Sequence, residues 1–570
     1  MAALLDEALQ SFQSGNFEEA ASLARSVLEQ KRDDPYAIHI LASIALVRNM
    51  PATTIALLGR ILPSLPQAED PFLLGRVYQT FGRALMCENL LDAARSAFFL
   101  SIQYFPEEAS AHAGLGETLL KMGQPVEAVS SLSQAIRLSP KEAVLWGLLG
   151  AAYIQCGQYQ QAVPAYDQAQ KIVPEESSFY ANQGVAFFHL AQWEKAHDAL
   201  EKAFSLGNRN METQLTMALV RLSLGNVLSA RKIFQQLYNS YPDNPALLLA
   251  YGSFCYETGE RNEAETLFLA AGKCDPSCDV NDVTVAKAAF NRGAIALEKG
   301  QWDEGWSLYE QRKVFSPQLH DASLPEWDGS TGEEAVALKL EGGAGDVMMF
   351  LRFLPDAAMR RPLRLDFPPD MLDMLAFMPD VPRSRLVAAG APVIAWQSLN
   401  SLPFLLGKKP DPKPYLHVPG SVEPDLIGLC WAGNADYLYD RRRSVPVSLL
   451  EPLRWIKGVR FLGLQREGVP DWMEKAPLAH LSDLALAVQR CALVISVDSL
   501  VANMAGAMGK DLWLLHRKGG DWRWSHHFWY RNVRLFAPDQ ESDIPEETWK
   551  PVIRTLGEAV VTWAAQGHRL

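Results

Sequence analysis

The stretch WGLLGAAYIQCGQYQQAVPAYDQAQKIVP, residues 146–174, decides the fold of the first half of the chain. It carries small residues at Gly150 and Ala162, a turn glycine at Gly157 and a proline at Pro174. A small residue lets one helix approach its neighbour closely, and proline ends a helix because it lacks an N–H donor. The stretch therefore predicts two short helices joined by a tight turn.

The same pattern recurs every 34 residues over residues 1–315. A fixed period of this length indicates an array of helical hairpins, each of which buries its apolar face against the next. We expect about nine hairpins when the weaker copies at both ends are included. The small residues in register are Gly82, Gly116, Gly150, Gly184, Ala218 and Gly252, followed twelve residues later by Ala94, Ala128, Ala162, Ala196, Ala230 and Ala264.

With Trp146, Leu149 and Tyr153 added, the opening stretch resembles the tetratricopeptide repeat. The resemblance implies a superhelix whose concave face binds a protein partner, with a plain spacer as the alternative. The position two before each small residue should face that groove. Asparagine side chains at these positions would hold the backbone of an extended peptide, but only Asn182 is an asparagine and most of the others are small or apolar. We therefore expect a folded or helical partner, whose side chains supply the contact. The positions are Thr80, Gly114, Leu148, Asn182, Thr216 and Ala250.

The composition is that of a globular protein, with 570 residues, 48% hydrophobic and 21% charged, and a net charge of -13. This acidity argues against a general nucleic-acid binder, which needs a basic face. Seven cysteines spread over the chain favour a reducing compartment. No stretch has the ~18 apolar residues needed to cross a bilayer. We therefore expect a cytoplasmic protein without membrane insertion and without a nucleic-acid partner.

The repeat period fails after Tyr309, and residues 316–334 read as a linker. Beyond it, β-prone runs alternate with segments of helical spacing. This alternation predicts a mainly parallel α/β sheet, whose ligands lie at the carboxyl ends of its strands. The predicted strands are AVALKLE (335–341), LIGLCWAGN (426–434), VRFLGL (459–464), ALVISVD (492–498) and DLWLLH (511–516).

The first loop at such an end is GGAGD, residues 342–346. Its glycines, Gly345 among them, allow the backbone to approach a ligand, and Asp346 stands where a helix begins. The alternative is that Asp346 only caps that helix. The loop lacks the Lys and Ser/Thr of a nucleoside-triphosphate cradle, and its spacing is not that of a dinucleotide-binding loop.

Two further loops and a basic, aromatic segment add candidate ligand contacts. Arginines at 441–443 follow a buried strand, although a solvated basic run is the alternative. Asp498 and Ser499 end a strand and open a helix whose first amides point at an anion. In residues 516–534, Trp522 and Arg523 belong to a set of cations beside flat rings. Such a set suits a ligand with phosphate or carboxylate and a base or sugar.

These loops, in this order, resemble those of a GT-B glycosyltransferase, and more closely the bacterial heptosyltransferase family (glycosyltransferase family 9) and its relatives with tetratricopeptide arms. The resemblance implies a mixed α and α/β fold class. A tetratricopeptide α-solenoid over 1–315 and the linker at 316–334 precede two Rossmann-like lobes. The acceptor-side lobe covers 335–420, and the nucleotide-sugar-binding lobe covers 421–570.

The resemblance also implies roles for single residues. Asp346, in GGAGDVMMFLRFLP, matches the aspartate proposed as general base. In ISVDSLVANMAGAMG, Leu500 and Asn503 replace the usual Gly and His, so the donor pocket should differ. Arg443 and the first amides of the following helix would stabilise charge on the leaving phosphate. The residues expected to bind the donor are Gly345, Asn434, Arg443, Asp498, Ser499, Leu500, Asn503, Trp522 and Arg523.

A repeat arm on such a body resembles the alphaproteobacterial flagellin glycosyltransferases. This implies transfer of a nonulosonic acid from a cytidine-monophosphate-linked donor to Ser/Thr of flagellin held by the arm. No Asp-x-Asp pair occurs in the chain to clamp a divalent ion, so we expect no metal and no cofactor beyond the nucleotide-sugar. The alternatives are a non-catalytic scaffold with a degenerate transferase domain, and a heptosyltransferase-like enzyme of surface polysaccharide synthesis.

Overall fold

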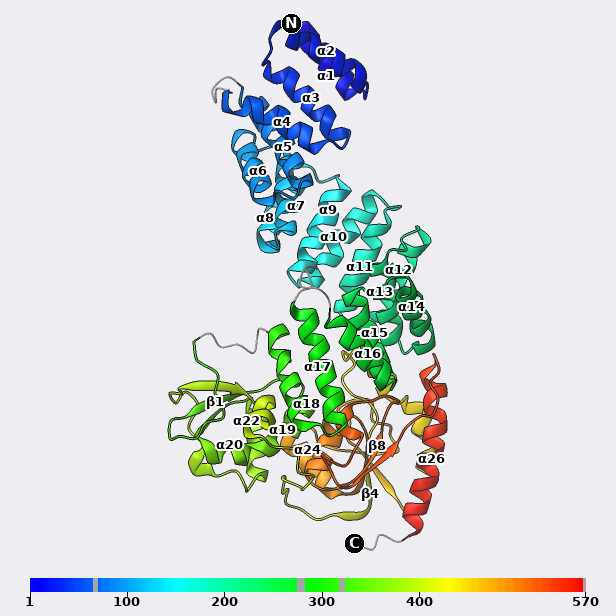
Figure 1. Cartoon of the computed structure of the whole chain (residues 1–570). Helices are drawn as coiled ribbons and strands as arrows, with labels where there is room; N and C mark the ends of the chain where they lie inside the picture. Colours follow the sequence, from blue (N-terminus) through cyan, green and yellow to red (C-terminus); the bar gives the residue numbers. More distant parts are fainter. Residues whose placement is uncertain (65–69, 274–281, 317–322, 567–570) are drawn as a thin grey trace. The chain divides into compact units, whose positions relative to one another are not determined.

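The computed structural model describes residues 1–64, 70–273, 282–316 and 323–566 (Figure 1). Part of the expected linker, residues 317–322, lies outside the described residues. The chain divides into two compact units, Met1–Thr216 and Met217–Leu570. This division falls inside the repeat array, so the later repeat helices share a compact unit with the sheets.

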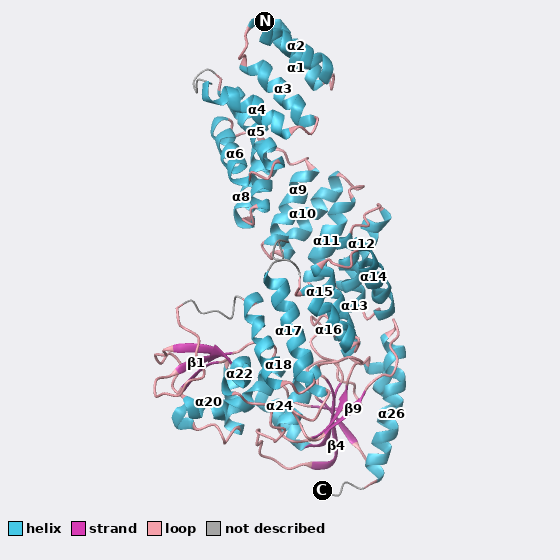
Figure 2. Ribbon diagram, in the orientation of Figure 1, coloured by secondary structure: helices cyan, strands magenta, loops and turns pink. Residues whose placement is uncertain are grey.

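The first unit consists of helices that pack in successive hairpins, α1 with α2 through α11 with α12 (Figure 2). Helix α13 (Met211–Ser223) crosses the boundary between the units. The helices of the first unit are α1 (Ala2–Gln13), α2 (Phe17–Gln30), α3 (Pro35–Val47), α4 (Pro51–Ile61), α5 (Pro71–Cys87), α6 (Leu91–Tyr104), α7 (Ala109–Lys121), α8 (Pro125–Leu138), α9 (Ala143–Gln155), α10 (Tyr159–Ile172), α11 (Ser177–His189) and α12 (Trp193–Ser205).

The small residues of the period bring the two helices of each hairpin together. A Cβ atom built on Gly116 would lie 2.6 Å from Leu132, and one on Gly150 would lie 2.6 Å from the Tyr166 ring. The alanine that follows twelve residues later is fully buried in every copy, as at Ala162. The predicted close approach is therefore confirmed, because a methyl group at these positions would meet a side chain of the paired helix.

In the second unit, repeat helices contact the α/β body. Helix α15 pairs with α16, and α17 pairs with α18. Helix α17 also contacts the short helix η9 (Trp522–Trp524), and α18 contacts α22 (Leu402–Leu406). The repeat helices here are α14 (Val227–Ser240), α15 (Pro245–Glu257), α16 (Arg261–Ala271), α17 (Asp282–Glu298) and α18 (Trp302–Tyr309).

Two parallel sheets form the body. The smaller has the order β2-β1-β3, with β1 (Val336–Lys339), β2 (Leu363–Asp366) and β3 (Ala395–Ser398). The larger has the order β6-β5-β4-β7-β8-β9. Its strands are β4 (Glu423–Cys430), β5 (Arg460–Gly463), β6 (Glu474–Lys475), β7 (Cys491–Val497), β8 (Asp511–Leu515) and β9 (Val533–Phe536).

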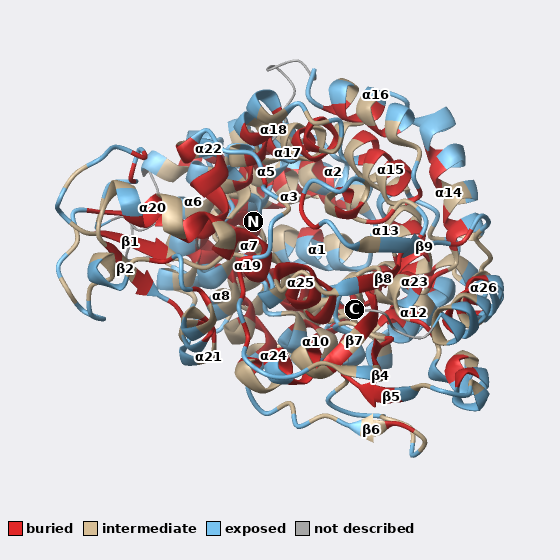
Figure 3. Cartoon of the chain, turned by 90° about the horizontal axis from the view of Figure 1, so that it is seen from below, coloured by how far each residue is buried: buried red, intermediate tan, exposed pale blue. Residues whose placement is uncertain are grey.

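Helices cover the sheets and place the candidate loops. Helix α25 is buried along nearly its whole length (Figure 3). On another face of the large sheet, α26 packs through Trp549, which is fully buried. The body helices are α19 (Ala344–Phe350), α20 (Leu354–Arg360), α21 (Pro369–Asp373), α22, α23 (Asp440–Arg443), α24 (Leu481–Arg490), α25 (Leu500–Ala507) and α26 (Pro545–Ala565).

One hydrophobic core joins the last repeat hairpin to both sheets. It contains Trp306 of α18, Val336 of β1, Phe350 of α19 and Trp529, all buried. The segment between the repeats and β1 also takes part, because the Trp327 N–H donates to the Trp396 carbonyl of β3 at 2.8 Å. The second unit is therefore held together by contacts that cross from the repeat helices into the α/β body.

All five predicted strands are present as β1, β4, β5, β7 and β8. Four others were not predicted from the sequence: β2, β3, β6 and β9. These are two to four residues long and gain their partners only through long-range pairing. Among the described residues, no helix combines the length and the apolar character needed to cross a membrane.

Candidate functional site

The candidate catalytic aspartate lies at the start of α19, the helix that follows β1. Asp346 Oδ2 accepts a hydrogen bond from the Gly343 N–H at 3.2 Å, so the carboxylate does cap this helix. Its other oxygen, Oδ1, accepts from Arg523 Nη1, which comes from the large-sheet side of the body. The Asp346 side chain remains about one third exposed, at 35%. Asp346 thus faces the second sheet and is linked to it by an ion pair.

Arg523 holds three carboxylates in one electrostatic group. Besides Asp346, it binds Asp521 through Nε at 2.8 Å and through Nη2 at 2.6 Å. Burial opposes ionisation of Asp521, but the Arg523 guanidinium holds the pKa of Asp521 below its ordinary value. Asp498 differs, because burial and then the Asp521 charge raise its pKa. Two nearby carboxyl groups with pKa values pushed apart are typical of acid–base sites.

Asp498 is fixed by an aromatic donor. The Trp524 Nε1–H donates to Asp498 Oδ1 at 2.8 Å. The positive charge of Arg443 also acts on Asp498 and favours its ionised form. The structure therefore brings Asp498, Arg443 and Arg523 into one neighbourhood, although they come from three separate loops. Neither Asp521 nor Trp524 was assigned a role from the sequence, and only their position between the basic residues of 516–534 pointed to them.

The start of α25 is the second element of the site. Ser499 precedes the helix, and its Oγ lies 3.0 Å from Ser496 Oγ. The first amides of a helix have no intrahelical acceptor, and here these are the amides of Leu500, Val501 and Ala502, since the Asn503 N–H already donates to the Ser499 carbonyl. Gly345 packs against this helix start, since a Cβ on it would lie 3.1 Å from Asn503 Nδ2 and 3.6 Å from the Leu500 nitrogen. Glycine at 345 is what allows the two loops to approach this closely.

Two of the expected donor contacts have internal partners instead. Asn503 is 4% exposed, donates from Nδ2 to the Ser499 carbonyl at 3.0 Å and accepts from the Tyr530 hydroxyl at 3.2 Å. Trp522 is buried, with its ring centroid 6.2 Å from that of Trp306 and 6.0 Å from that of Trp529. The aromatic residues of 516–534 were expected to contact ligand, but Trp522 instead fills the core between the sheets and the last repeat hairpin.

The three consecutive arginines have different roles. Arg443 is half-buried, pairs with Asp440 at 2.7 Å and lies over the Tyr437 ring at 4.6 Å. Its Nη2 also reaches the carbonyl of Asn434 at 3.4 Å, while the Asn434 side chain is taken by a local turn. Arg443 and Asn434 are thus adjacent, as their shared loop suggested.

Arg442 is a structural residue rather than a ligand contact. It is 6% exposed and donates to the Glu257 carbonyl of α15 at 3.1 Å. Arg517 donates to the same carbonyl at 3.2 Å and pairs with the Glu257 carboxylate. Both cations were expected at a ligand, but they hold a repeat hairpin against the body. Sequence spacing does not reveal this, because Glu257 lies far away in the chain.

A small cavity opens beside Arg523. Its volume is about 130 Å³, and it is lined by residues of the basic, aromatic segment and β9. A cavity of this size, lined by both polar and apolar side chains, has room for part of a ligand rather than a whole nucleotide-sugar. The lining residues are Arg523, Trp524, Ser525, His526, His527, Tyr530, Val533 and Leu535.

One group of described residues has metal-ligand spacing. Cys255, Glu260 and Glu263 offer ligand atoms within 4.8 Å of one another. However, Arg231 Nη1 lies 2.8 Å from Glu260, and the Tyr251 hydroxyl donates to Glu263 at 3.2 Å. Glu260 is therefore already paired with a guanidinium, and Glu263 already accepts a hydrogen bond.

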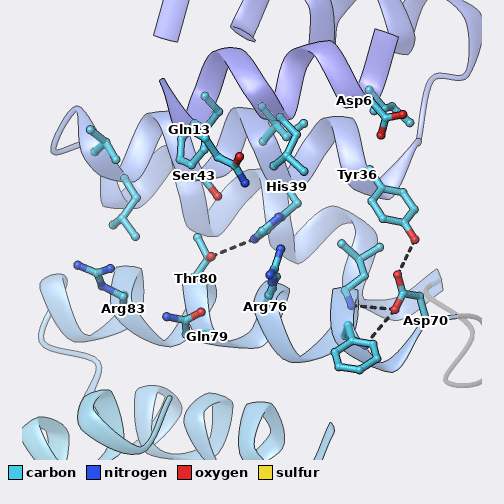
Figure 4. Close-up of a pocket in the computed structure, with 18 residues that line it drawn as sticks. Asp6, Gln13, Tyr36, His39, Ser43, Asp70, Arg76, Gln79, Thr80 and Arg83 are labelled. Carbon is cyan, nitrogen blue, oxygen red and sulfur yellow. Dashed lines mark hydrogen bonds between the residues drawn. The ribbon is translucent and has the colours of Figure 1, made fainter. Parts of the chain in front are cut away.

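The first unit has a groove of its own, with a volume of about 460 Å³ (Figure 4). It is lined by α1, α3 and α5, the first helices of the first three hairpins. In its floor, His39 Nε2 lies 3.0 Å from Thr80 Oγ1, and burial together with the charge of Arg76 lowers the pKa of His39 to about 4. Arg76 and Arg83 are exposed in the groove, as is the ring of Phe72, at 61%. Asp6 and Asp70 also line the groove, which thus combines apolar surface with charges of both signs.

Sequence and structure comparisons bear on the repeat array. Residues 119–182 and 221–281 match a family model described as tetratricopeptide repeat. Protein FlbA of Caulobacter vibrioides (strain ATCC 19089 / CIP 103742 / CB 15) is 26% identical over 342 residues, which cover 49% of this chain. The chain spans 56% of the length of that curated relative.

Similar solved structures include YrrB, described as a TPR protein with an unusual peptide-binding site. It is 19% identical with a TM-score of 0.30, over 34% of this chain and 96% of YrrB. A chain of the APC/C hetero-tetramer Cut9-Hcn1 is 15% identical with a TM-score of 0.37, over 50% of this chain and 55% of that one. The family model and the helical hairpins agree: the first part of this chain is an array of tetratricopeptide repeats, followed by a region with parallel sheets.

Proposed function

We propose that the chain is a metal-independent GT-B glycosyltransferase that modifies a protein acceptor held by its repeat array. The observation that carries this proposal is the meeting of Asp346, at the end of one parallel sheet, with Arg523 and the start of α25, at the end of the other. Ligands of parallel α/β sheets bind at such carboxyl ends.

The residues present suit transfer of a sugar from a nucleotide donor. Asp346 would take the proton from the acceptor hydroxyl. Arg443, Arg523 and the amides from Leu500 onward would stabilise negative charge on the departing phosphate. Because Arg523 is bound to Asp346 in the free protein, a donor phosphate that attracts Arg523 would release Asp346 Oδ1 for proton transfer.

We propose a cytidine-monophosphate-linked nonulosonic acid as the donor and Ser/Thr of flagellin as the acceptor. The groove of α1, α3 and α5 supports capture of a protein segment, since it presents exposed arginines beside the exposed Phe72 ring. Because Asp6 and Asp70 also line the groove, such a surface suits an amphipathic segment that carries charges of both signs.

A binding scaffold with an inactive transferase body is the competing function. The ion pair that occupies Asp346 and the internal hydrogen bonds of Asn503 favour it. Calorimetry with cytidine and uridine nucleotides separates the two, because an inactive scaffold should bind neither at micromolar concentration.

Transfer itself is tested by mass spectrometry of flagellin from cells with the wild-type chain or with Asp346→Asn. We expect glycosylated flagellin only with the wild-type chain. Asp373→Asn is the control, since Asp373 is an exposed carboxylate of the same part of the body. Unmodified flagellin in wild-type cells would contradict the acceptor, and full modification with Asp346→Asn would contradict the catalytic role.

A further inference from the structure

The segment that carries Arg523 is held from both sides by repeat helices. Arg261, at the start of α16, donates from Nη2 to the Gly520 carbonyl at 2.9 Å. At the other end of the segment, the Ser525 hydroxyl donates to Glu298 Oε1 of α17 at 2.7 Å. Both anchors come from the tetratricopeptide array, and the segment between them contains Asp521, Arg523 and Trp524.

The repeat side of this contact is itself rigid. Arg261 Nε binds Glu298 Oε2 at 2.6 Å, and the guanidinium lies 4.0 Å from the centre of the Tyr256 ring. The side chains of Arg261 and Glu298 are only 18% and 16% exposed. A guanidinium with a paired carboxylate and a ring beneath it keeps one orientation, because its planar fork loses little freedom on binding.

The anchored segment makes the contacts that order the candidate site. Arg523 binds Asp346, and Trp524 binds Asp498. Loss of the Gly520 anchor would therefore free the residues that fix both carboxylates. Among the described residues, Arg261 forms no hydrogen bond or ion pair with Asp346 or Asp498, so any effect on them must pass through the segment.

We infer that the last repeat hairpins complete the donor site, and that Arg261 is a positioning residue for Arg523 and hence for Asp346. This inference rests on the proposed function for its ligand, since it assigns to a repeat residue an effect on nucleotide binding. Its structural part is that Arg261 orders residues 342–350 and 516–526, and this part does not depend on which ligand binds.

The test uses the full chain with Arg261→Ala, Arg261→Lys and a control, Arg231→Ala. Arg231 of α14 is a matched residue: it is 26% exposed, pairs with Glu260 at 2.8 Å and lies 5.0 Å from the Phe254 ring centre. Its partners in the described part of the chain, Glu260 and Phe254, belong to the repeat helices and their turns. For each variant we would measure the melting temperature, cytidine monophosphate affinity by calorimetry, and deuterium uptake of residues 342–350 and 516–526.

For Arg261→Ala we expect about tenfold weaker nucleotide binding, the loss typical of one charge-assisted hydrogen bond, and faster exchange in both segments. Arg261→Lys should recover part of both. Arg231→Ala should change the melting temperature but neither of the other measurements. Nucleotide affinity within twofold of wild type for Arg261→Ala, or an equal loss for Arg231→Ala, would overturn the inference.

The two proposals fail in different ways. A wild-type chain that binds neither cytidine nor uridine nucleotides contradicts the proposed function and the ligand part of the inference. The exchange measurement then still decides the structural part. Unchanged uptake at 342–350 in Arg261→Ala would show that Arg261 does not position Asp346.

Discussion

Gly519 provides a sharp test of how tightly the repeats are joined to the α/β body. A Cβ atom on Gly519 would lie 2.2 Å from the Gly259 nitrogen and 2.6 Å from both the Glu257 oxygen and the Thr258 carbonyl carbon. All three are backbone atoms of the turn between α15 and α16, so a flexible side chain cannot move aside. Gly519→Ala must therefore push the turn and the body apart.

The magnitude follows from two separate costs. Gly519 has φ +63°, where a residue with a Cβ is less stable by roughly 1–2 kcal/mol. Forcing a methyl group into a packed contact costs roughly 1–3 kcal/mol more. We expect a total loss of about 2–5 kcal/mol for Gly519→Ala.

Gly407→Ala isolates the first cost. Gly407 has nearly the same φ, +61°, and a Cβ there would meet nothing within 4 Å. It ends α22, also in the second unit. The control should lose only about 1–2 kcal/mol, the cost of the left-handed backbone alone.

Hydrogen exchange measures the difference directly. We would determine the opening free energy of the amides in residues 255–262, which form the end of α15, the following turn and the start of α16. It should fall in Gly519→Ala by about 1–3 kcal/mol, the cost of overpacking, and remain unchanged in Gly407→Ala. Equal protection of residues 255–262 in both variants would refute the tight joint between the repeats and the body.

Three further predictions concern the groove, a contact between the two sheets' helices and the buried arginines. Arg76→Glu should weaken the binding of purified flagellin at least about tenfold, because it reverses a charge in the groove. Arg95→Glu on α6, outside the groove lining, should leave the affinity unchanged. Fluorescence anisotropy measures the affinity of each variant for flagellin. His480 Nδ1 lies 2.9 Å from Oδ1 of Asp370 in α21, and this hydrogen bond raises the pKa of His480. The hydrogen bond with Asp370 should therefore stabilise the protein fully below the ordinary histidine pKa of 6.5, and this stabilisation should be lost as pH rises through the raised pKa. Hydrogen exchange of the α21 amides should depend on pH for this reason, and His480→Gln should remove that dependence. An unchanged pH profile of exchange in His480→Gln would contradict the prediction. Arg442 also forms an ion pair with Glu541, whose side chain is 11% exposed. Arg442→Ala should therefore destabilise the second unit by about 3–5 kcal/mol, since it leaves this nearly buried carboxylate without its partner. Arg466→Ala, at an exposed position, should change stability by less than about 0.5 kcal/mol, and urea unfolding followed by tryptophan fluorescence compares the two variants.

The repeat array was predictable because its information is local and periodic. Gly150 and Tyr166 meet within one hairpin, so a fixed spacing in the sequence becomes a fixed contact in the structure. Strands β4 and β7 were also predictable, since central parallel strands are apolar on both faces and read as continuous runs. Strand β9 was not, because four residues with exposed Arg534 and Leu535 carry no such pattern.

The candidate site was predictable by loop but not by side chain. Glycines and a helix start mark where Asp346 and Ser499 lie, and the two loops do approach each other. The fate of neighbouring arginines depends on partners far away in the chain. Arg442 donates to the Glu257 carbonyl of α15 and therefore does not face the candidate site, whereas the charge of the adjacent Arg443 acts on Asp498. The spacing of residues in the sequence does not distinguish Arg442 from Arg443, because the contact of Arg442 with α15 joins residues that are 185 positions apart and is evident only in the three-dimensional structure.

The position of the compact-unit boundary matters for how this protein is divided into fragments. A cut after residue 315, where the repeat pattern ends, would remove α14 to α18 from the body and expose to solvent the faces of Phe350 and Trp522 that pack against Trp306. Such a truncated body should be prone to aggregation, and its failure to act on an acceptor would say nothing about the acceptor. A cut in the turn between α12 and α13, just before the unit boundary, keeps helix α13 whole and preserves the shared core, so the fragments on either side of that turn are the ones whose separate behaviour is informative.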